Sequence, residues 1–486
     1  MSADSTSELA YLSATDALAA FRRRELSPVE LLTAVLDQAA AAEPVVNAVV
    51  ERLEEQAFEA AREAERRYLG KGGGDIRPLE GLPVAAKEEH PIEGHPHQLG
   101  SLLHAGDVAT ATHPVIQRIA AAGGIVHVRT STPEFCAAGF THSKLWGVTR
   151  NPWNPEYSCG GSSGGSGAAL AAGYAPLATG SDIGGSIRIP ASFNGVVGFK
   201  PPFGRVPAMP PYSLDQFCHD GPMARTVADC ALLENVIAGP WKGDVVSLRP
   251  KLVLPETYEG ARGVEGLRIA LSVTLGDHPV DPEVAANTRA VAEALRTAGA
   301  IVEEVELGWT RKTINRALMA HFAAVMGAEA GDAVAAAPDL VNPYLRAFSE
   351  KAAAETTTFA EGLVLEGEIY AELGEILDRF DALICPTTSI PAFLADDEYT
   401  ETKVVVDGVE LDFYLDAALT PPFNICSRVP VLAVPSGFAS NGVPTGVQIA
   451  AKTYDDETVF RVGAAVEAVR PWAYTADRRP AAVRRP

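Results

Sequence analysis

The sequence lacks the features typical of secreted or membrane-spanning chains. Its 486 residues contain no run of about 18 apolar residues that could span a bilayer. The first residues, MSADSTSELAYL, lack the basic segment and apolar run of a secretory signal. The six cysteines are scattered without a CxxC pair, which is typical of a reduced protein. We therefore expect a cytoplasmic protein with no membrane partner.

Basic residues are scarce relative to acidic ones. Lys and Arg number 40, Asp and Glu number 62, and the net charge is −22. The only basic groupings are residues 22–24 and the terminal arginines Arg478, Arg479, Arg484 and Arg485. Because such a surface repels phosphate backbones, we expect no nucleic-acid partner. The 47% hydrophobic content predicts a large folded core.

Alternating strand and helix patterns indicate an α/β fold. Apolar strand patterns at 81–87 and 125–129 flank a helix pattern at 114–122, an order that predicts a parallel strand pair. Further strand patterns occur at 267–271, 301–307, 382–385, 429–434 and 445–449. We expect one domain made of an N-terminal helical segment (1–75), a core with catalytic loops (76–310), a helical excursion (311–380) and a C-terminal part of the same core (381–486).

Glycine is concentrated between residues 160 and 198, which hold 11 of the 43 glycines. A flexible linker is one interpretation, but the apolar residues around these glycines argue against it. Tight glycine turns leave backbone N–H groups free to bind an anion, such as a phosphate or the oxyanion of an acyl transfer. No GxxxxGK[ST] motif is present, whereas Ser186 stands beside the second glycine run as a candidate nucleophile.

A serine nucleophile needs a base, and no histidine lies in this window. A lysine can serve only in its neutral form, which burial favours. Lys87 ends the apolar stretch 82–86, at the type of strand end where α/β sheets place their chemistry. Position alone does not distinguish this role from that of an ordinary surface lysine.

Three motifs together resemble the amidase signature hydrolases: GLPVAAK at 81–87, CGGSSGGSGAAL at 159–170 and GSDIGGSIRIPASFNGVVGFKP at 180–201. The chain is similar to bacterial amidases that include 6-aminohexanoate oligomer and cyclic-dimer hydrolases and aryl acylamidases. The resemblance implies an α/β fold with a large mixed, mostly parallel twisted sheet covered by helices on both faces. It also implies that neither a metal nor an organic cofactor is needed.

The resemblance assigns a catalytic triad. Ser186 would form the acyl-enzyme, Ser162 would follow a cis peptide and bridge Ser186 to Lys87, and Lys87 would be neutral in the resting enzyme. The implied oxyanion hole consists of the N–H groups of Ile183, Gly184, Gly185 and Ser186. The implied supporting residues are Ser163, Asp182 and Arg188, and the implied pocket residues are Gly161 and Cys136. A buried structural thiol is the alternative interpretation of Cys136.

The residues after Lys87 depart from the family pattern, which usually has Asp and often then Asn; here Glu88 and Glu89 follow. On a continuing strand Glu88 would point away from Lys87, and Glu89 could share its face. Since a close carboxylate would raise the lysine pKa, we expect both glutamates to point elsewhere. The histidine-rich segment 90–97 and the loop 207–212 are also unusual, and we expect such loops to shape the substrate pocket.

The predicted activity is hydrolysis of an acyl–nitrogen bond in a small-molecule amide, with an oligoamide, aryl amide or carbamate as substrate. One alternative is the amidase-like glutaminase component of a tRNA amidotransferase. The other is a metal-dependent amidohydrolase that uses the His-x-His pair His95 and His97. A homodimer is expected from the family resemblance.

Overall fold

The computed structural model describes residues 8–472, 474 and 478–483. The first seven residues of the N-terminal segment, and the terminal Arg484 and Arg485, lie outside the described residues.

A single large sheet organises the chain. Its eleven strands run in the order β1-β3-β2-β6-β8-β7-β14-β15-β11-β9-β10. Their bounds are β1 Val49–Arg52, β2 Pro83–Lys87, β3 Ile125–Thr130, β6 Leu177–Asp182, β7 Val197–Lys200, β8 His219–Ala224, β9 Arg268–Leu271, β10 Ile301–Glu304, β11 Ala382–Pro386, β14 Val431–Phe438 and β15 Pro444–Ala451. Two short hairpins, β4 (His142–Ser143) with β5 (Gly147–Val148) and β12 (Val405–Val406) with β13 (Val409–Glu410), lie outside this sheet.

The sheet is mixed, as predicted. β2 pairs in parallel with β3 and β6 near one edge, and β9 pairs in parallel with β10 and β11 at the other. The strands between these groups, from β6 through β15, pair antiparallel. The predicted parallel pair of β2 and β3, linked through a helix, is confirmed. β1, which the sequence patterns did not reveal, adds an antiparallel edge strand.

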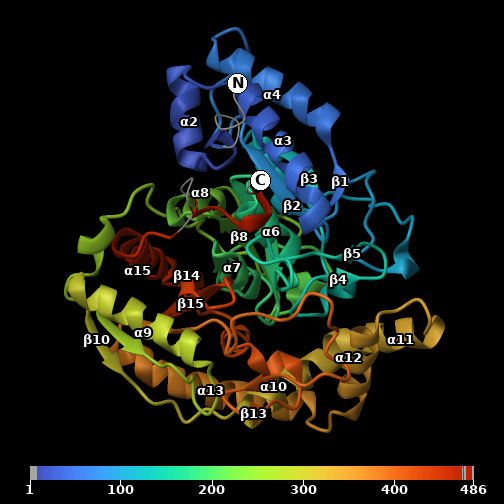
Figure 1. The fold of residues 1–486 in the computed structure, drawn as a ribbon, viewed down its shortest axis with the longest axis vertical. Helices are drawn as coiled ribbons and strands as arrows, with labels where there is room; N and C mark the ends of the chain where they lie inside the picture. Colours follow the sequence, from blue (N-terminus) through green and yellow to red (C-terminus); the bar gives the residue numbers. More distant parts are fainter. Residues whose placement is uncertain (1–7, 473, 475–477, 484–486) are drawn as a thin grey trace.

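Helices cover the sheet and gather at both ends of the molecule (Figure 1). They are α2 Ala14–Arg23, α3 Pro28–Val46, α4 Glu54–Tyr68, α5 Pro114–Ala121, α6 Gly164–Ala171, α7 Arg188–Asn194, α8 Val227–Ile237, α9 Pro282–Thr297, α10 Arg311–Phe322, α11 Ala328–Ala336, α12 Pro343–Ala354, α13 Phe359–Arg379, α14 Pro422–Ile425 and α15 Asp456–Val469. Helices α2–α4 lie at one end and α10–α13 at the opposite end (Figure 1). Helix α3 begins with a capping box, in which the Ser27 and Glu30 side chains accept each other's backbone N–H.

The glycine-rich segment is part of the core rather than a linker. Every residue of α6 and α7 is buried, and α7 packs on β14 and β15. A side chain at Gly165 would place its Cβ 2.5 Å from the backbone nitrogen of Ser131, so only glycine allows this approach. The two helices thereby fix the loops that precede them, and these loops carry Ser162 and Ser186.

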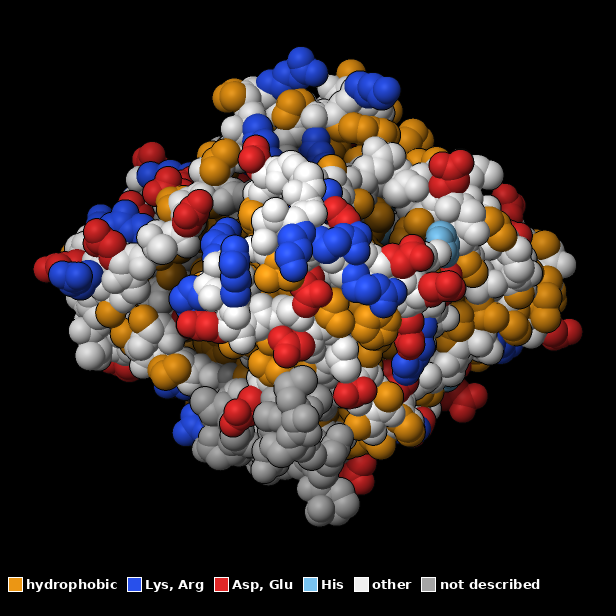
Figure 2. Space-filling view, turned by 90° about the horizontal axis from the view of Figure 1, so that it is seen from above, with side chains coloured by type: hydrophobic (Ala, Val, Ile, Leu, Met, Phe, Trp, Pro, Cys, Tyr) orange, Lys and Arg blue, Asp and Glu red, His pale blue; other side chains and the backbone are white. Residues whose placement is uncertain are grey.

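Charges of both signs lie close together on the surface. Figure 2 shows a group of Lys and Arg side chains near the middle of one face, with Asp and Glu side chains around it. Among the described residues, no helix combines the length and apolar character needed to cross a bilayer.

Candidate active site

Lys87, Ser162 and Ser186 come from three segments that the fold brings together. Lys87 is the last residue of β2, while Ser162 and Ser186 lie in the loops before α6 and α7. Lys87 Nζ lies 2.7 Å from Ser162 Oγ. Lys87 is 0% exposed, Ser162 is 1% exposed and Ser186 is 8% exposed. The serine predicted to attack the substrate is therefore the most accessible of the three.

The loop that carries Ser162 has the predicted backbone form, with a cis peptide between Gly161 and Ser162. The Ser163 N–H donates to the Ser186 carbonyl over 3.0 Å and joins the two serine loops. The Ser163 hydroxyl contacts the backbone of Ser181 rather than Lys87. Ser186 Oγ makes no hydrogen bond to any described residue. It is thus free to meet a substrate, and catalytic hydrogen bonds are often formed only in the complex.

The loop from Ile183 to Ser186 presents free backbone donors. The N–H groups of Ile183, Gly184 and Ser186 meet no acceptor within the part of the chain that the structure describes. The Gly185 N–H instead donates to Asp182 Oδ1 over 2.8 Å. The expectation that Gly185 supplies an oxyanion donor is therefore wrong, because its hydrogen is already bound to a carboxylate. Gly185 has φ +130°, a conformation that favours glycine, and its role is to shape the loop.

A buried ion pair between Asp182 and Arg188 supports this loop. Their side chains form a fully buried two-pronged ion pair, with both N–O distances 2.9 Å. Burial opposes ionisation of Asp182, but Arg188 outweighs it and lowers the carboxyl pKa. Three residues that sequence reasoning missed accept the remaining hydrogens of Arg188: Thr420, Asn424 and Gln448. They come from the C-terminal part of the chain, and no local pattern links them to the glycine-rich motif.

Glu88 and Glu89 take opposite directions. Glu88 accepts the backbone N–H groups of Gln98 and Leu99 and points away from Lys87, as predicted. Glu89 lies with Oε2 2.7 Å from Lys87 Nζ, so the expectation that it points elsewhere is wrong. The reason is a turn, in which the His90 N–H bonds to the Lys87 carbonyl over 3.0 Å. The strand therefore ends at Lys87, and strand alternation does not apply to Glu89.

A second hydroxyl, that of Ser181, also contacts the lysine. Ser181 Oγ, on β6, accepts from Lys87 Nζ over 2.7 Å and donates to Glu89 Oε2 over 2.5 Å. Lys87 Nζ thus has three oxygen neighbours, two hydroxyls and one carboxylate. The role of Ser181 was not predicted, although it lies within the recognised 180–201 motif.

These contacts alter the ionisation of Lys87. Burial alone lowers its pKa, but the Coulombic attraction of Cys136 and Glu89 outweighs burial, and the net pKa is raised. Since burial raises the pKa of Cys136 to about 12, that residue is a thiol at neutral pH and Glu89 supplies the attraction there. The pKa of Glu89 is correspondingly lowered to about 2, because Lys87 outweighs the effect of burial. The contact with Glu89 therefore favours the charged form of Lys87 and opposes the neutral form that the mechanism needs.

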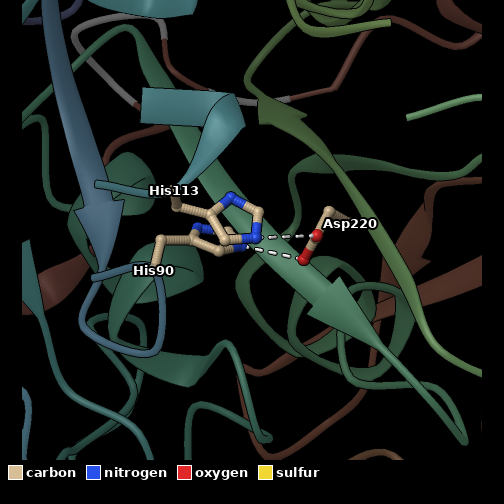
Figure 3. Close-up of side chains that lie close together, drawn as sticks. All are labelled: His90, His113 and Asp220. Carbon is tan, nitrogen blue, oxygen red and sulfur yellow. Dashed lines mark hydrogen bonds and ion pairs between the residues drawn. The ribbon is translucent and has the colours of Figure 1, made fainter. Parts of the chain in front are cut away.

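Next to Glu89 in the chain, His90 contacts the carboxylate of Asp220, and so does His113 (Figure 3). His90 Nε2 lies 2.9 Å from Oδ1, and His113 Nε2 lies 3.4 Å from Oδ2. His90 Nδ1 lies 2.9 Å from Thr179 Oγ1, which accepts the Lys87 N–H over 3.0 Å. This chain of hydrogen bonds fixes the end of β2 and hence the position of Lys87.

The same three residues are the one group of metal-capable side chains found among the described residues. The Val115 N–H donates to His113 Nδ1 over 3.3 Å, so the proton of this imidazole lies on Nε2, facing Asp220. Burial lowers the His113 pKa to about 4, which keeps the ring neutral. A protonated Nε2 has no lone pair for a metal, and the arrangement fits a hydrogen-bonded brace.

His95 and His97 are not part of that group. His95 Nδ1 pairs with Glu51 over 2.8 Å, and His97 Nε2 contacts the Glu89 carbonyl over 3.2 Å. The structure does not bring these two histidines together with further ligands in the described chain. Within the described residues, His95 and His97 therefore give no support to the metal-dependent alternative.

Two adjoining cavities reach the serines. The larger, of about 330 Å³, is lined by Glu89, Ser162 and Ser181, and the loop 208–212 forms part of its wall. The smaller, of about 40 Å³, is lined by Ile183, Gly184 and Ser186. Of the two predicted pocket residues, Cys136 lines both cavities and Gly161 lines the smaller one.

Comparisons with known proteins agree with this geometry. A family model described as Amidase matches residues 30–460. The Acylamidase of Rhodococcus erythropolis is 34% identical over 485 residues, covering 97% of this chain and 98% of the relative. A glutamyl-tRNA(Gln) amidotransferase component of Chloroflexus aurantiacus is 33% identical over 494 residues, covering 96% and 98%. The crystal structure of a bacterial aryl acylamidase of the amidase signature enzymes superposes with a TM-score of 0.86 at 28% identity, covering 95% of this chain and 97% of that one.

Proposed function

The chain belongs to the amidase signature family and hydrolyses amide bonds, and we propose that it does so through an acyl-enzyme on Ser186. The observation that carries this proposal is the arrangement of one accessible serine beside free N–H groups, with a second serine hydrogen-bonded to a buried lysine. The substrate is a small-molecule amide, and we favour an aryl amide because the aryl acylamidase superposes with the higher TM-score, 0.86 against 0.80 for a 6-aminohexanoate cyclic dimer hydrolase.

The reaction begins when Ser186 Oγ bonds to the amide carbon. Its proton passes to Ser162 Oγ, whose own proton passes to neutral Lys87. A hydroxyl suits this relay because it donates and accepts at once. The carbonyl oxygen becomes an oxyanion facing the free N–H groups of Ile183 and Gly184, a type of contact worth about 3–4 kcal/mol per donor. The C–N bond then breaks, and the amine leaves with the proton returned through Ser162.

Water completes the cycle. It attacks the ester on Ser186, gives its proton to the same relay, and releases the carboxylic acid. Lys87 acts in its neutral form, and Glu89 makes that form scarce at neutral pH by holding the ammonium. The rate therefore rises as the pH increases toward the raised pKa of Lys87.

Replacing the nucleophile tests the proposal. We expect Ser186→Ala to lower kcat by at least about a thousandfold on any amide that the wild type cleaves. Ser440→Ala is the matched control, because Ser440 is an exposed serine that bonds to Glu283. Mass spectrometry of the quenched wild type should find the acyl group on Ser186. Full activity in Ser186→Ala, or an acyl group on another residue, would refute the mechanism.

The similarity to components of the glutamyl-tRNA(Gln) amidotransferase makes a glutaminase the second candidate. Such an activity releases ammonia, and ammonia needs no room on the leaving side of the site. The 330 Å³ cavity beside Ser162 offers far more room than that and favours a larger amine. Turnover of aryl amides by the purified chain alone supports the amidase, and strict dependence on glutamine and added partner proteins supports the alternative.

We further propose that the protein is cytoplasmic and works as one domain without nucleic acid. Six free cysteines fit a reducing compartment. The sheet draws strands from both Val49–Arg52 and Pro444–Ala451, which supports a single folding unit spanning the four segments predicted from the sequence. A homodimer stays a prediction, and light scattering on the purified protein tests it.

A further inference from the structure

Resting on the acyl-enzyme mechanism above, we propose that the larger cavity binds the leaving amine and selects amines with a positively charged far end. The smaller cavity then takes a short, apolar acyl group. The substrate class is an N-acyl amine with a few-atom acyl group and a bulky, mostly apolar amine that carries an ammonium or similar cation.

The position of the proton relay indicates which cavity takes the acyl group and which takes the amine. The departing nitrogen must receive its proton from Ser162, and Ser162 lines the larger cavity but not the smaller. Ser186 and Gly184 line the smaller cavity, so the acyl carbon bonded to Ser186 has its substituent there. The amine therefore extends into the larger cavity.

The volumes set the sizes of the two groups. About 40 Å³ holds only a few non-hydrogen atoms, since one water needs roughly 10–15 Å³ on this measure. The wall beyond Gly184 is aromatic, with Phe322 and Phe348 closing it. About 330 Å³ lies within the roughly 300–1,000 Å³ range of small-molecule sites. The walls of this larger cavity include Leu99, Met209 and Met326, which suit an apolar amine body.

The acidic side chains of the larger cavity are not matched by lysine or arginine side chains in its wall. Three carboxylates line it, and no Lys or Arg does so among the described residues. Two of the three already have partners: Glu89 pairs with Lys87, and the Asp220 carboxylate contacts two histidines. Glu329, in the first turn of α11, forms no ion pair with any residue the structure describes.

Glu329 is held toward the cavity by Tyr212. The Tyr212 hydroxyl donates to Glu329 Oε2 over 3.1 Å, which joins the loop 208–212 to α11 across the cavity. Burial, together with the Glu329 charge, raises the pKa of Tyr212, so this hydroxyl stays a donor. An exposed, uncompensated carboxylate at the edge of an apolar cavity complements a cation and repels a carboxylate.

The test compares three acetyl anilides that differ at the para position: aminomethyl (cationic), methyl (neutral) and carboxymethyl (anionic). We expect wild-type kcat/KM to favour the cationic over the anionic compound. In Glu329→Gln this ratio should fall by about threefold to fivefold, the effect of one partly exposed charge pair. Comparing ratios between enzymes cancels the chemical differences among the anilides.

Asp332→Asn is the matched control. Asp332 is an exposed carboxylate on the same helix, and it does not line either cavity, so its variant should keep the wild-type ratio. Hexanoyl counterparts test the acyl side, and we expect them to react at least about tenfold more slowly than the acetyl compounds, because a chain of six carbons exceeds the smaller cavity.

The outcomes separate the two proposals. A ratio unchanged in Glu329→Gln, an equal fall in Asp332→Asn, or a preference for hexanoyl compounds would overturn this inference while Ser186-dependent turnover kept the proposed function. Absence of turnover on every anilide, with glutamine cleaved only beside added partner proteins, would overturn the proposed function and this inference with it.

Discussion

Gly185→Ala perturbs the oxyanion loop without removing any free donor. At φ +130° an alanine is strained, and its Cβ would lie 2.1 Å from Thr420 Oγ1 and 2.9 Å from Ile189 Cδ1. Thr420 cannot simply move, because its hydroxyl donates to the Gly184 carbonyl over 2.6 Å and its carbonyl accepts from Arg188. The loop must therefore shift, and the N–H groups of Ile183 and Gly184 shift with it.

The expected magnitudes follow from these contacts. The disfavoured backbone costs about 1–3 kcal/mol, and a lost Thr420 hydrogen bond adds about 0.5–1.5 kcal/mol. We therefore expect the free energy of unfolding to fall by roughly 2–4 kcal/mol. Misplaced donors lower kcat by about a hundredfold to a thousandfold, the loss expected when one oxyanion donor is removed. KM should change less, because the cavity walls remain.

The assay is steady-state kinetics on an acetyl anilide beside thermal and urea unfolding. Gly408→Ala is the control, because Gly408 also has a positive φ of +78° but a Cβ there meets nothing within 4 Å. It should lose about 1 kcal/mol of stability and no activity. A folded Gly185→Ala enzyme with wild-type kcat would show that the loop geometry does not create the oxyanion hole.

The two remaining predictions concern charge and metal. Glu89→Gln removes a carboxylate that raises the Lys87 pKa, and the burial of Lys87 should then lower that pKa. We therefore expect the acid limb of the pH profile of kcat/KM to move to lower pH. If the limb stays in place or moves to higher pH, Lys87 is not the group that titrates. Dialysis against EDTA should leave the rate of amide hydrolysis unchanged, because the proton on His113 Nε2 occupies the position that a metal would need. Activity that is lost to EDTA and restored by zinc would contradict this prediction.

Much of the fold follows from sequence patterns because the signals are local. The β2–α5–β3 order rests on short apolar stretches of adjacent residues, and the structure confirms it. β1 was missed because its four residues, three half-buried and one exposed, give no strand periodicity. An edge strand of this length depends on its partner β3, which is distant in the sequence.

The residues of the site likewise fall into those that local motifs predict and those that they do not. The motifs located Lys87, Ser162 and Ser186, and the cis peptide before Ser162 is as expected. Other residues that shape the site come from segments outside these motifs: Asp220 from β8, Thr420 from the loop before α14, and Glu329 from α11. Their side chains act through contacts between distant segments, and a single sequence carries no pattern for such contacts.

Glu89 shows why a departure from a family pattern needs a structural explanation. Its charge opposes catalysis at neutral pH, because it stabilises the ammonium form of Lys87. The same carboxylate lines the cavity proposed for the amine and adds to its negative potential. A cation bound there raises the local positive potential, and this disfavours the charge on Lys87. We therefore expect a cationic amine in this cavity to weaken the attraction by which Glu89 stabilises the ammonium form of Lys87.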